Sequence, residues 1–407
     1  MLQSPSFTFS SEASQIRQVL RFAQRLLALV CIPGLLAVAL VMVVGWRSGA
    51  TFSPVEIARM QTADPTLLWS GDGRYYLMYK AALAEQRHSD IVLLGHSRGT
   101  QMRSMMFKPY VFTNGSITAW TIDQLRFALD HVTRHYRPKV AIFNLDYFML
   151  NSTYRDNWAE KSHMALSWTD RDYFDGLMNL SWVVKAKPLT MLRRLPTVLL
   201  SRFREEANGL SLIGPQAIAL DGGFRSDGSA LYDPVRRNEA PTAAHDLGRL
   251  IPTVPSGTGR HLDMGEAAKL RDLANLAKER GVVLVGIQLP YFKMATDLLD
   301  SGRDYGGYRG EDTGIWREFN SPETKAMFED MGILFYDLSR HLTAGDPRGF
   351  IDIAHPSEAV TLAALIDMFK DPKMRAVLPD VDILRLEQTL DDAMHRQTFF
   401  DVYGAQF

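Results

Sequence analysis

Ser97 stands where a serine can act as a nucleophile, directly after an apolar run. Residues 90–94 read DIVLL and residues 95–99 read GHSRG, which is typical of a buried strand followed by a sharp turn. Much later in the chain, Asp352-x-x-His355 supplies a carboxylate and an imidazole. A serine hydroxyl needs a base to take its proton, and that base works best when a carboxylate fixes its tautomer. The pattern predicts nucleophilic catalysis with Ser97 as nucleophile, His355 as general base and Asp352 as the orienting carboxylate.

Each of these residues also has a purely structural interpretation. Ser97 could cap a helix after a strand, and Asp352 with His355 could form a loop turn or bind a metal. The late Asp-x-x-His favours the catalytic interpretation over both. His96 is expected to be structural rather than a base, because it lies on the wrong side of the turn. Arg98 could bind an anionic substrate group or pair with a surface carboxylate.

The elements that must position these residues alternate between strand and helix. Strands are expected at 90–94, 110–112, 139–143, 282–288 and 333–336. Helices are expected at 97–106, 122–136, 266–280, 322–331 and 357–370. Such alternation predicts an α/β fold with a parallel sheet covered on both faces.

Residues 26–46 predict a transmembrane anchor, because these twenty-one residues carry no charge. At about 1.5 Å per residue, such a helix spans roughly 30 Å, the thickness of a hydrocarbon core. Arg17, Arg21 and Arg25 precede the run, so the positive-inside rule places the N-terminus in the cytoplasm. We expect a single-pass protein of the cell inner membrane with its catalytic domain in the periplasm. A cleaved signal peptide is the alternative, but the run is long for one.

The anchor and a break in the alternation divide the chain into segments. Residues 150–264 interrupt the alternation, and we interpret them as an insertion or lid. The catalytic domain is then made of residues 89–149 and 265–375. The remaining segments are the cytoplasmic N-terminus (1–25), the anchor (26–46), a juxtamembrane lead-in (47–88) and a C-terminal helix (376–407).

Charge and cysteine content argue against several kinds of partner. The net charge of −1, with no clustered basic excess, gives no sign of nucleic-acid binding. No Cys/His cluster or His-Glu-x-x-His motif indicates a metal, and no cofactor is expected. The only cysteine, Cys31, lies in the predicted anchor, so disulfides contribute nothing to the exported part.

The Gly-x-Ser-x-Gly pattern matches the nucleophile elbow of α/β-hydrolases. In that fold several strands precede the elbow, but few residues lie between the anchor and Ser97. Its acid and histidine also usually lie on separate loops, whereas Asp352 and His355 share one segment. A lipase or esterase of that fold is the least favoured alternative, and it predicts several strands before the elbow strand.

A serine after the first strand and an Asp-x-x-His before the last helix resemble the SGNH/GDSL hydrolase superfamily. The resemblance covers roughly residues 90–146 and 266–370. It implies an SGNH-like flavodoxin-type three-layer sandwich with a parallel sheet. It also implies that Asp352 orients His355, that His355 activates Ser97, and that backbone amides and an asparagine side chain hold the oxyanion.

The expected oxyanion residues depart from the family pattern in two places. The amide of Ser97 is one expected donor. The block NGSITA has Ala119 where a glycine is usual, and only its backbone N–H is required. The block NLDY aligns with Gly-x-Asn-Asp, so Asp146 falls where the asparagine belongs. Either Asn144 supplies the amide, Asp146 is protonated, or that donor is missing.

Membrane-anchored proteins with this core resemble accessory enzymes of cell-surface polymer acylation. Examples are the alginate O-acetylation proteins and the D-alanine transfer protein of teichoic acid synthesis. The resemblance implies a serine O-acyltransferase or esterase acting on a cell-surface polysaccharide, beside a membrane-bound O-acyltransferase partner. Trp69, Tyr75 and Tyr76 could stack on sugar rings or serve packing. The alternative from another class is a catalytically silent SGNH-like scaffold, which binds polysaccharide or organises an acylation complex.

Overall fold

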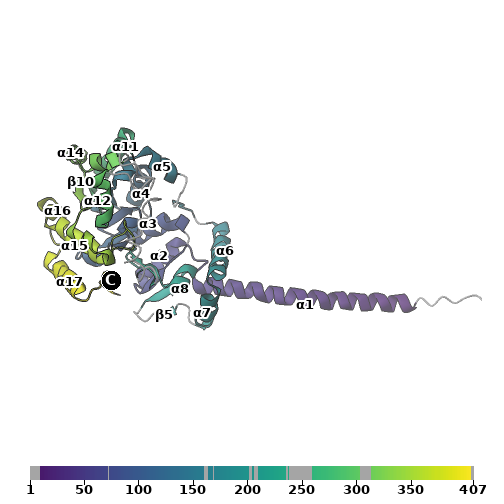
Figure 1. Cartoon of the computed structure of the whole chain (residues 1–407). Coiled ribbons are helices and arrows are strands. Elements are labelled where there is room, and N and C mark those ends of the chain that lie inside the picture. The colour runs from purple at the N-terminus through teal and green to yellow at the C-terminus, as the bar shows by residue number, and fades with distance from the viewer. Residues whose placement is uncertain are drawn as a thin grey trace, which may run out of the picture.

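A computed structural model of the chain contains two five-stranded sheets (Figure 1). A long N-terminal helix projects away from both (Figure 1). The structure describes residues 10–71, 73–159, 164–167, 169–200, 204–205, 210–234, 237, 259–302 and 313–404.

One sheet has strands of four to six residues and is called the larger sheet here. It is parallel throughout, and its first strand along the chain lies inside it. The order is β10-β9-β4-β2-β3, so β2 lies between β3 and β4. Among the described residues, no strand earlier in the chain than β2 belongs to this sheet, which differs from the α/β-hydrolase alternative. Every residue of β2, β3 and β4 is buried, as expected for strands covered on both faces. The strands are β2 (Ile91–Gly95), β3 (Phe112–Ser116), β4 (Val140–Asn144), β9 (Val283–Gln288) and β10 (Leu334–Asp337).

Alternate residues of β2 enter two different hydrophobic cores. Val92 and Leu94 pack in a core with residues of α3, α4, α11 and α14. Ile91 and Leu93 pack in a second core with residues of α15, α16 and α17. Because successive strand side chains point to opposite faces, these helices cover the two faces of the sheet. The helices are α3 (Tyr76–Gln86), α4 (Ile122–His135), α11 (Met264–Glu279), α14 (Pro322–Asp330), α15 (Glu358–Lys370), α16 (Pro372–Val377) and α17 (Ile383–His395).

The other sheet has shorter strands and is called the smaller sheet here. It joins the lead-in (47–88) to the segment 150–264. Its order is β5-β6-β1-β7-β8. β1 comes from the lead-in and pairs parallel with β6 and antiparallel with β7, both from the segment 150–264. The strands are only two or three residues long, too short to show a period in the sequence. They are β1 (Leu67–Trp69), β5 (Arg204–Glu205), β6 (Ser211–Ile213), β7 (Gly223–Phe224) and β8 (Ala230–Leu231).

The N-terminal helix α1 (Ser10–Ser48) is long and apolar enough to cross a membrane. Two further helices, α6 (Asp170–Ala186) and α7 (Pro188–Leu200), lie across its C-terminal end (Figure 1). The remaining helices are α2 (Pro54–Ala63), α5 (Ser152–Ala159), α8 (Pro215–Leu220), α12 (Lys293–Ser301) and α13 (Gly314–Phe319).

Two elements near the serine differ from the sequence prediction. The helix expected at 97–106 is two 3₁₀ turns, η2 (Ser97–Gln101) and η3 (Ser104–Met106). The Asn114 side chain accounts for the break, because its Nδ2 donates to the carbonyls of Gly99 and Met102, both at 2.8 Å. The strand expected at 110–112 instead runs over β3, because pairing with β2 includes its polar half.

Candidate active site

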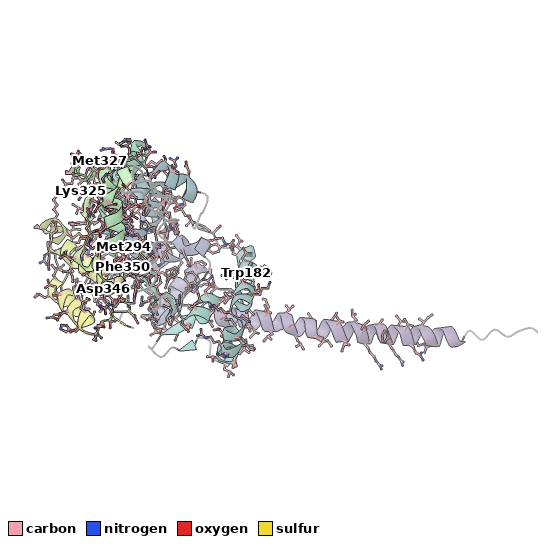
Figure 2. All side chains as sticks on the ribbon, viewed as in Figure 1. Trp182, Met294, Lys325, Met327, Asp346 and Phe350 are labelled. Atoms are coloured by element: carbon pink, nitrogen blue, oxygen red, sulfur yellow. The ribbon has the colours of Figure 1, made fainter. Side chains whose placement is uncertain are left out.

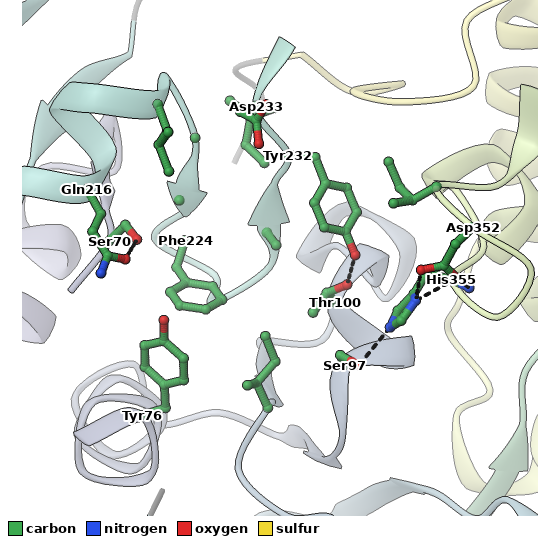
Figure 3. A pocket seen from close by; sticks show the side chains of 17 residues that line it. Ser70, Tyr76, Ser97, Thr100, Gln216, Phe224, Tyr232, Asp233, Asp352 and His355 are labelled. Atoms are coloured by element: carbon green, nitrogen blue, oxygen red, sulfur yellow. Dashed lines mark hydrogen bonds and ion pairs between the residues drawn. The ribbon is translucent and has the colours of Figure 1, made fainter. Parts of the chain in front are cut away.

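The structure brings Ser97 and His355 into direct contact across 258 positions of the chain. Ser97 Oγ lies 2.7 Å from His355 Nε2 (Figure 3). Ser97 begins η2, two residues after Gly95, which ends β2 with φ +140°. A Cβ at Gly95 would stand 2.8 Å from Asn144 Oδ1, so both the backbone angle and the space favour glycine. This turn places the hydroxyl at the carboxyl edge of the parallel sheet.

Asp352 holds His355 from the other side of the ring. Both carboxylate oxygens lie 2.8 Å from His355 Nδ1, and Oδ1 accepts the N–H groups of Ala354 and His355 at 2.8 and 3.0 Å. Burial alone would raise the pKa of Asp352, but the His355 ring and these N–H groups lower it more, so the pKa lies well below its ordinary value. An ionised Asp352 assigns the proton to Nδ1, which leaves the Nε2 lone pair directed at Ser97.

Arg98 is buried next to the segment that carries Asp352 and His355. Its guanidinium group binds three separate segments of the chain. Its Nε donates to the Ala354 carbonyl at 2.8 Å. Its Nη2 donates to the carbonyls of Leu289 and Pro290 at 2.5 and 2.8 Å, just after β9, and its Nη1 donates to Asp146 after β4. The guanidinium also stacks 3.5 Å from the centre of the Tyr291 ring. Arg98 therefore binds neither a surface carboxylate nor the pocket; it ties the segment next to His355 to the sheet.

Asp146 is an ionised, fully buried partner of this arginine. It also accepts from the Tyr291 hydroxyl at 3.0 Å, and His96 Nε2 lies 2.8 Å away. Burial alone would raise the pKa of Asp146, but the lowering by Arg98 and His96 is larger than this rise, so the pKa falls below its ordinary value. This result contradicts the alternative in which Asp146 is a protonated oxyanion donor. Burial lowers the pKa of His96, so a neutral, structural His96 agrees with the expectation.

The other expected oxyanion residues are placed less favourably than the sequence suggested. The N–H of Ala119 donates to the Gly95 carbonyl at 3.2 Å, so this group is already bonded within the protein. Asn144 is fully buried behind the serine turn, and neither atom of its amide has a hydrogen-bond partner among the described residues. Its Oδ1 would lie 2.7 Å from a Cβ at Gly99. Asn144 is thus adjacent to the turn but does not line the pocket.

Ser97 and His355 open into a pocket of about 450 Å³ between the two sheets (Figure 3). One wall carries the triad and Thr100, and the opposite wall is built by the smaller sheet and the elements packed on it. Thr100 Oγ1 lies 2.8 Å from the Tyr232 hydroxyl, which joins the two walls beside the serine. Residues of the opposite wall include Ser70, Tyr76, Gln216, Phe224, Tyr232 and Asp233.

The pocket gains its polarity from hydroxyl and amide groups rather than from cations. Its described lining holds no lysine or arginine, and its carboxylates are Asp233 and Asp352. Within the described ranges, no group of three His, Cys, Asp or Glu could hold a metal ion. Among its described residues, the lining therefore offers no side-chain cation to an anionic ligand.

The aromatic residues singled out in the sequence divide between core and pocket. Trp69 and Tyr75 are 5% and 4% exposed, so packing explains them. Tyr76 lines the pocket, 5.0 Å from the Phe224 ring in an edge-to-face contact. Phe224 and Tyr232 were not expected at the site, because only the pairing of β7 and β8 with the smaller sheet brings them there.

Comparison with protein-family models, with curated proteins and with solved structures finds no match to this chain. The assignment of function therefore rests on the geometry of the site.

Proposed function

We propose that this chain is a membrane-anchored serine enzyme that transfers or hydrolyses acyl groups through an acyl-enzyme on Ser97. The observation that carries the proposal is the continuous chain of contacts from Ser97 Oγ through His355 to Asp352 at the mouth of a pocket. A serine that only caps a turn would not need His355 beside its hydroxyl, and a histidine with only a loop role would not need Asp352 beside its ring. A positioned base and its orienting carboxylate are the parts that nucleophilic catalysis requires.

The reaction follows from these contacts. Ser97 Oγ attacks the ester carbonyl carbon while its proton passes to His355 Nε2. The tetrahedral intermediate collapses as His355 returns that proton to the departing alkoxide, and the acyl group stays on Ser97. A sugar hydroxyl or water then attacks the acyl carbon, loses its proton to His355, and releases Ser97, which takes the proton back. Asp352 stabilises the imidazolium in both halves.

The fold supports the resemblance to SGNH/GDSL hydrolases. Numbered along the chain, the parallel strands stand in the order 2-1-3-4-5, which is the order of flavodoxin-like sheets. Ligands of such sheets bind outside the carboxyl ends of the strands, where Ser97 lies. In this proposal, residues 89–149 and 265–375 form the SGNH-like catalytic domain. The insertion 150–264 acts as a lid, since Phe224 and Tyr232 form part of the pocket wall.

The anchor and the pocket lining support a cell-surface polysaccharide as substrate. The pocket lining includes the aromatic rings of Tyr76 and Tyr232 and the polar side chains of Ser70 and Gln216. This is the mixture of stacking and hydrogen-bonding groups that sugar rings need. Arg17, Arg21 and Arg25, which lie in α1 before its uncharged run 26–46, support a cytoplasmic N-terminus and a periplasmic catalytic domain. O-acetyl is the proposed acyl group, and a membrane-bound O-acyltransferase is the proposed partner.

One observation favours the silent scaffold as a second candidate. Ala119 N–H is bonded to Gly95 and Asp146 is ionised, so two of the expected oxyanion groups are not available in this conformation. A scaffold would keep the fold and the pocket without stabilising an oxyanion.

A fluorophosphonate probe distinguishes the two candidates. The enzyme predicts covalent labelling of the wild-type chain and none of Ser97→Ala. Ser70→Ala is the matched control, because Ser70 lines the same pocket with its hydroxyl bonded to Gln216 rather than to an imidazole. It is expected to keep the labelling. Absence of labelling in the wild type would favour the scaffold, and labelling that survives Ser97→Ala would refute the assigned nucleophile.

A further inference from the structure

The helices α6 and α7 each expose a stripe of large apolar side chains. On α6, Phe174, Met178 and Trp182 are 62%, 59% and 69% exposed. Their spacing of four residues places them on one side of the helix. On α7, Leu189, Leu192 and Leu200 are 69%, 66% and 85% exposed, again on one side. We call these six residues the apolar face.

The opposite sides of both helices are already packed. Leu180 of α6, with Met191 and Val198 of α7, enters the core of the smaller sheet at 4%, 7% and 3% exposure. The apolar face is therefore not needed for folding of the globular part. Large contiguous apolar surface that folding does not explain marks an interaction site.

The contact with α1 fixes where this face lies relative to the membrane. A Cβ at Gly45 of α1 would stand 2.4 Å from Leu177 of α6, and a Cβ at Gly176 of α6 would stand 2.1 Å from the Ala50 carbonyl oxygen. The C-terminal end of α1 and the turn that follows it therefore pack closely against α6. Trp46, a residue type enriched at membrane–water boundaries, lies at this level. Figure 2 places Trp182 on the side of the globular part from which α1 leaves.

Positive charges border the apolar face. Lys185, Lys187 and Arg193 are exposed along the end of α6 and the first turns of α7. Tryptophan, phenylalanine and leucine on one side with lysine and arginine beside them is the composition of helices that lie in a membrane interface. The charges favour anionic lipid headgroups over the charge-poor surface typical of a protein interface core.

We propose that the apolar face of α6 and α7 inserts into the outer leaflet of the membrane that α1 spans, and so binds the globular part flat against the bilayer. This proposal does not depend on the catalytic role of Ser97. It has a consequence for access, because a surface hollow of about 400 Å³ lined by Met178 and Trp182 shares Gln216 with the catalytic pocket. The mouth of that pocket would then be held close to the lipid surface.

Site-directed spin labelling of the full chain tests the contact. Cys31 is the only cysteine, so Cys31→Ser gives a background for Trp182→Cys and Leu192→Cys, one position on each helix. Leu342→Cys is the matched control, since Leu342 is 97% exposed on the parallel-sheet side of the molecule. The labelled chains are reconstituted in vesicles of phosphatidylcholine and phosphatidylglycerol. Collision of the label with oxygen, which concentrates in lipid, is compared with collision with a water-soluble nickel chelate.

The proposal predicts an oxygen-to-nickel collision ratio severalfold higher at positions 182 and 192 than at 342. A ratio equal to that of the control would overturn it, because the face would then be in water. Low collision rates with both reagents would also overturn it, since a protein partner rather than lipid would cover the face. Each labelled chain must unfold at the same temperature as the wild type. If the label at position 182 or 192 changes that temperature, Phe174→Cys replaces the affected position, so the test does not depend on one variant.

Discussion

At the scale of single residues, the site depends on side chains that orient the base as much as on the base itself. Asp352 accepts three donors, from His355 Nδ1 and two backbone N–H groups. Arg98 fixes the carbonyl of Ala354 next to that histidine. A small rotation of the imidazole would direct the lone pair of Nε2 away from Ser97.

Asp352→Asn is expected to lower acyl-transfer activity by about a thousandfold or more while the chain stays folded. The amide would donate to Nδ1 and favour the tautomer that carries its proton on Nε2, which cannot accept from Ser97. The measurement is kcat with a chromogenic acetyl ester, with circular dichroism as the check on folding. An unchanged kcat would show that Asp352 does not orient His355.

Asp352 also predicts an acid-dependent loss of stability. Its pKa is lower in the folded chain than in the unfolded chain, so its contribution is present above the ordinary carboxyl pKa and is lost as pH falls toward the folded pKa. Thermal unfolding of the detergent-solubilised chain should show wild type and Asp352→Asn converging as pH is lowered from neutral to about 3. A constant difference over this range would contradict the assigned ionisation.

Arg98→Ala is expected to destabilise the chain by about 3–5 kcal/mol, because it leaves Asp146 as a buried charge without its cationic partner. Removing the charge as well, in Arg98→Ala with Asp146→Asn, should recover part of this loss. Denaturant unfolding of Arg98→Ala, Asp146→Asn and the double variant measures the difference. If the double variant were less stable by the sum of the single losses, the two side chains would not be coupled.

The sequence predicted residues whose chemistry is local and missed those whose role depends on distant backbone. The Asp-x-x-His spacing places Asp352 and His355 together whatever the rest of the fold does. Arg98 offered no such signal, because its partners Leu289 and Pro290 come from a remote strand end. Ala119 was expected to supply an amide, but the turn after β3 directs that N–H to Gly95.

At the scale of elements, the position of α3 depends on a buried lysine. Lys80 of α3 donates to the carbonyl of Gly228 in the turn between β7 and β8, and its Nζ lies 3.9 Å from the centre of the Phe224 ring. Burial lowers the pKa of Lys80 to about 7, although the nearby charge of Asp227 opposes the shift. A lysine that loses its charge as pH rises above neutrality thus lies at the junction of a helix and the pocket wall.

This lysine predicts that stability rises with pH above neutrality. Between pH 7 and the ordinary lysine pKa near 10.4, the unfolded chain holds a proton that the folded chain has released. The free energy of unfolding should therefore increase with pH by up to about 1.4 kcal/mol per unit in this window. Thermal unfolding of wild type and Lys80→Met between pH 7 and 10 measures it. Equal slopes for both chains would contradict the assignment.

Long buried strands were predictable, whereas short and polar ones were not. β4 and β9 lie within one residue of the predicted starts and ends, because strands buried on both faces are continuous apolar runs. β10, a half-buried strand at the edge of the sheet, is also within one residue of its prediction. β3 is displaced, since its second half is polar and only the pairing with β2 makes it a strand. Pairing of β1 with β6 joins segments far apart in sequence, and tertiary contact rather than local pattern determines it.

At the scale of the whole molecule, the proposed orientation predicts which side of the membrane the globular part occupies. In the Cys31→Ser background, Leu342→Cys should react with a membrane-impermeant maleimide in intact cells, because Leu342 is 97% exposed. The reason is that, in the proposed orientation, Arg17, Arg21 and Arg25 keep the N-terminus in the cytoplasm. Reaction only after the cells are permeabilised would place the catalytic domain on the cytoplasmic side.

The most direct test of the proposed catalytic triad is mass spectrometry of the full chain after brief incubation with an activated acetyl ester at low pH to slow deacylation. The contact of Ser97 with His355 predicts one added acetyl group on the peptide that contains Ser97, absent in Ser97→Ala and strongly reduced in His355→Ala. A wild-type chain that gains no acetyl group, or an added group that persists in Ser97→Ala, would contradict the account.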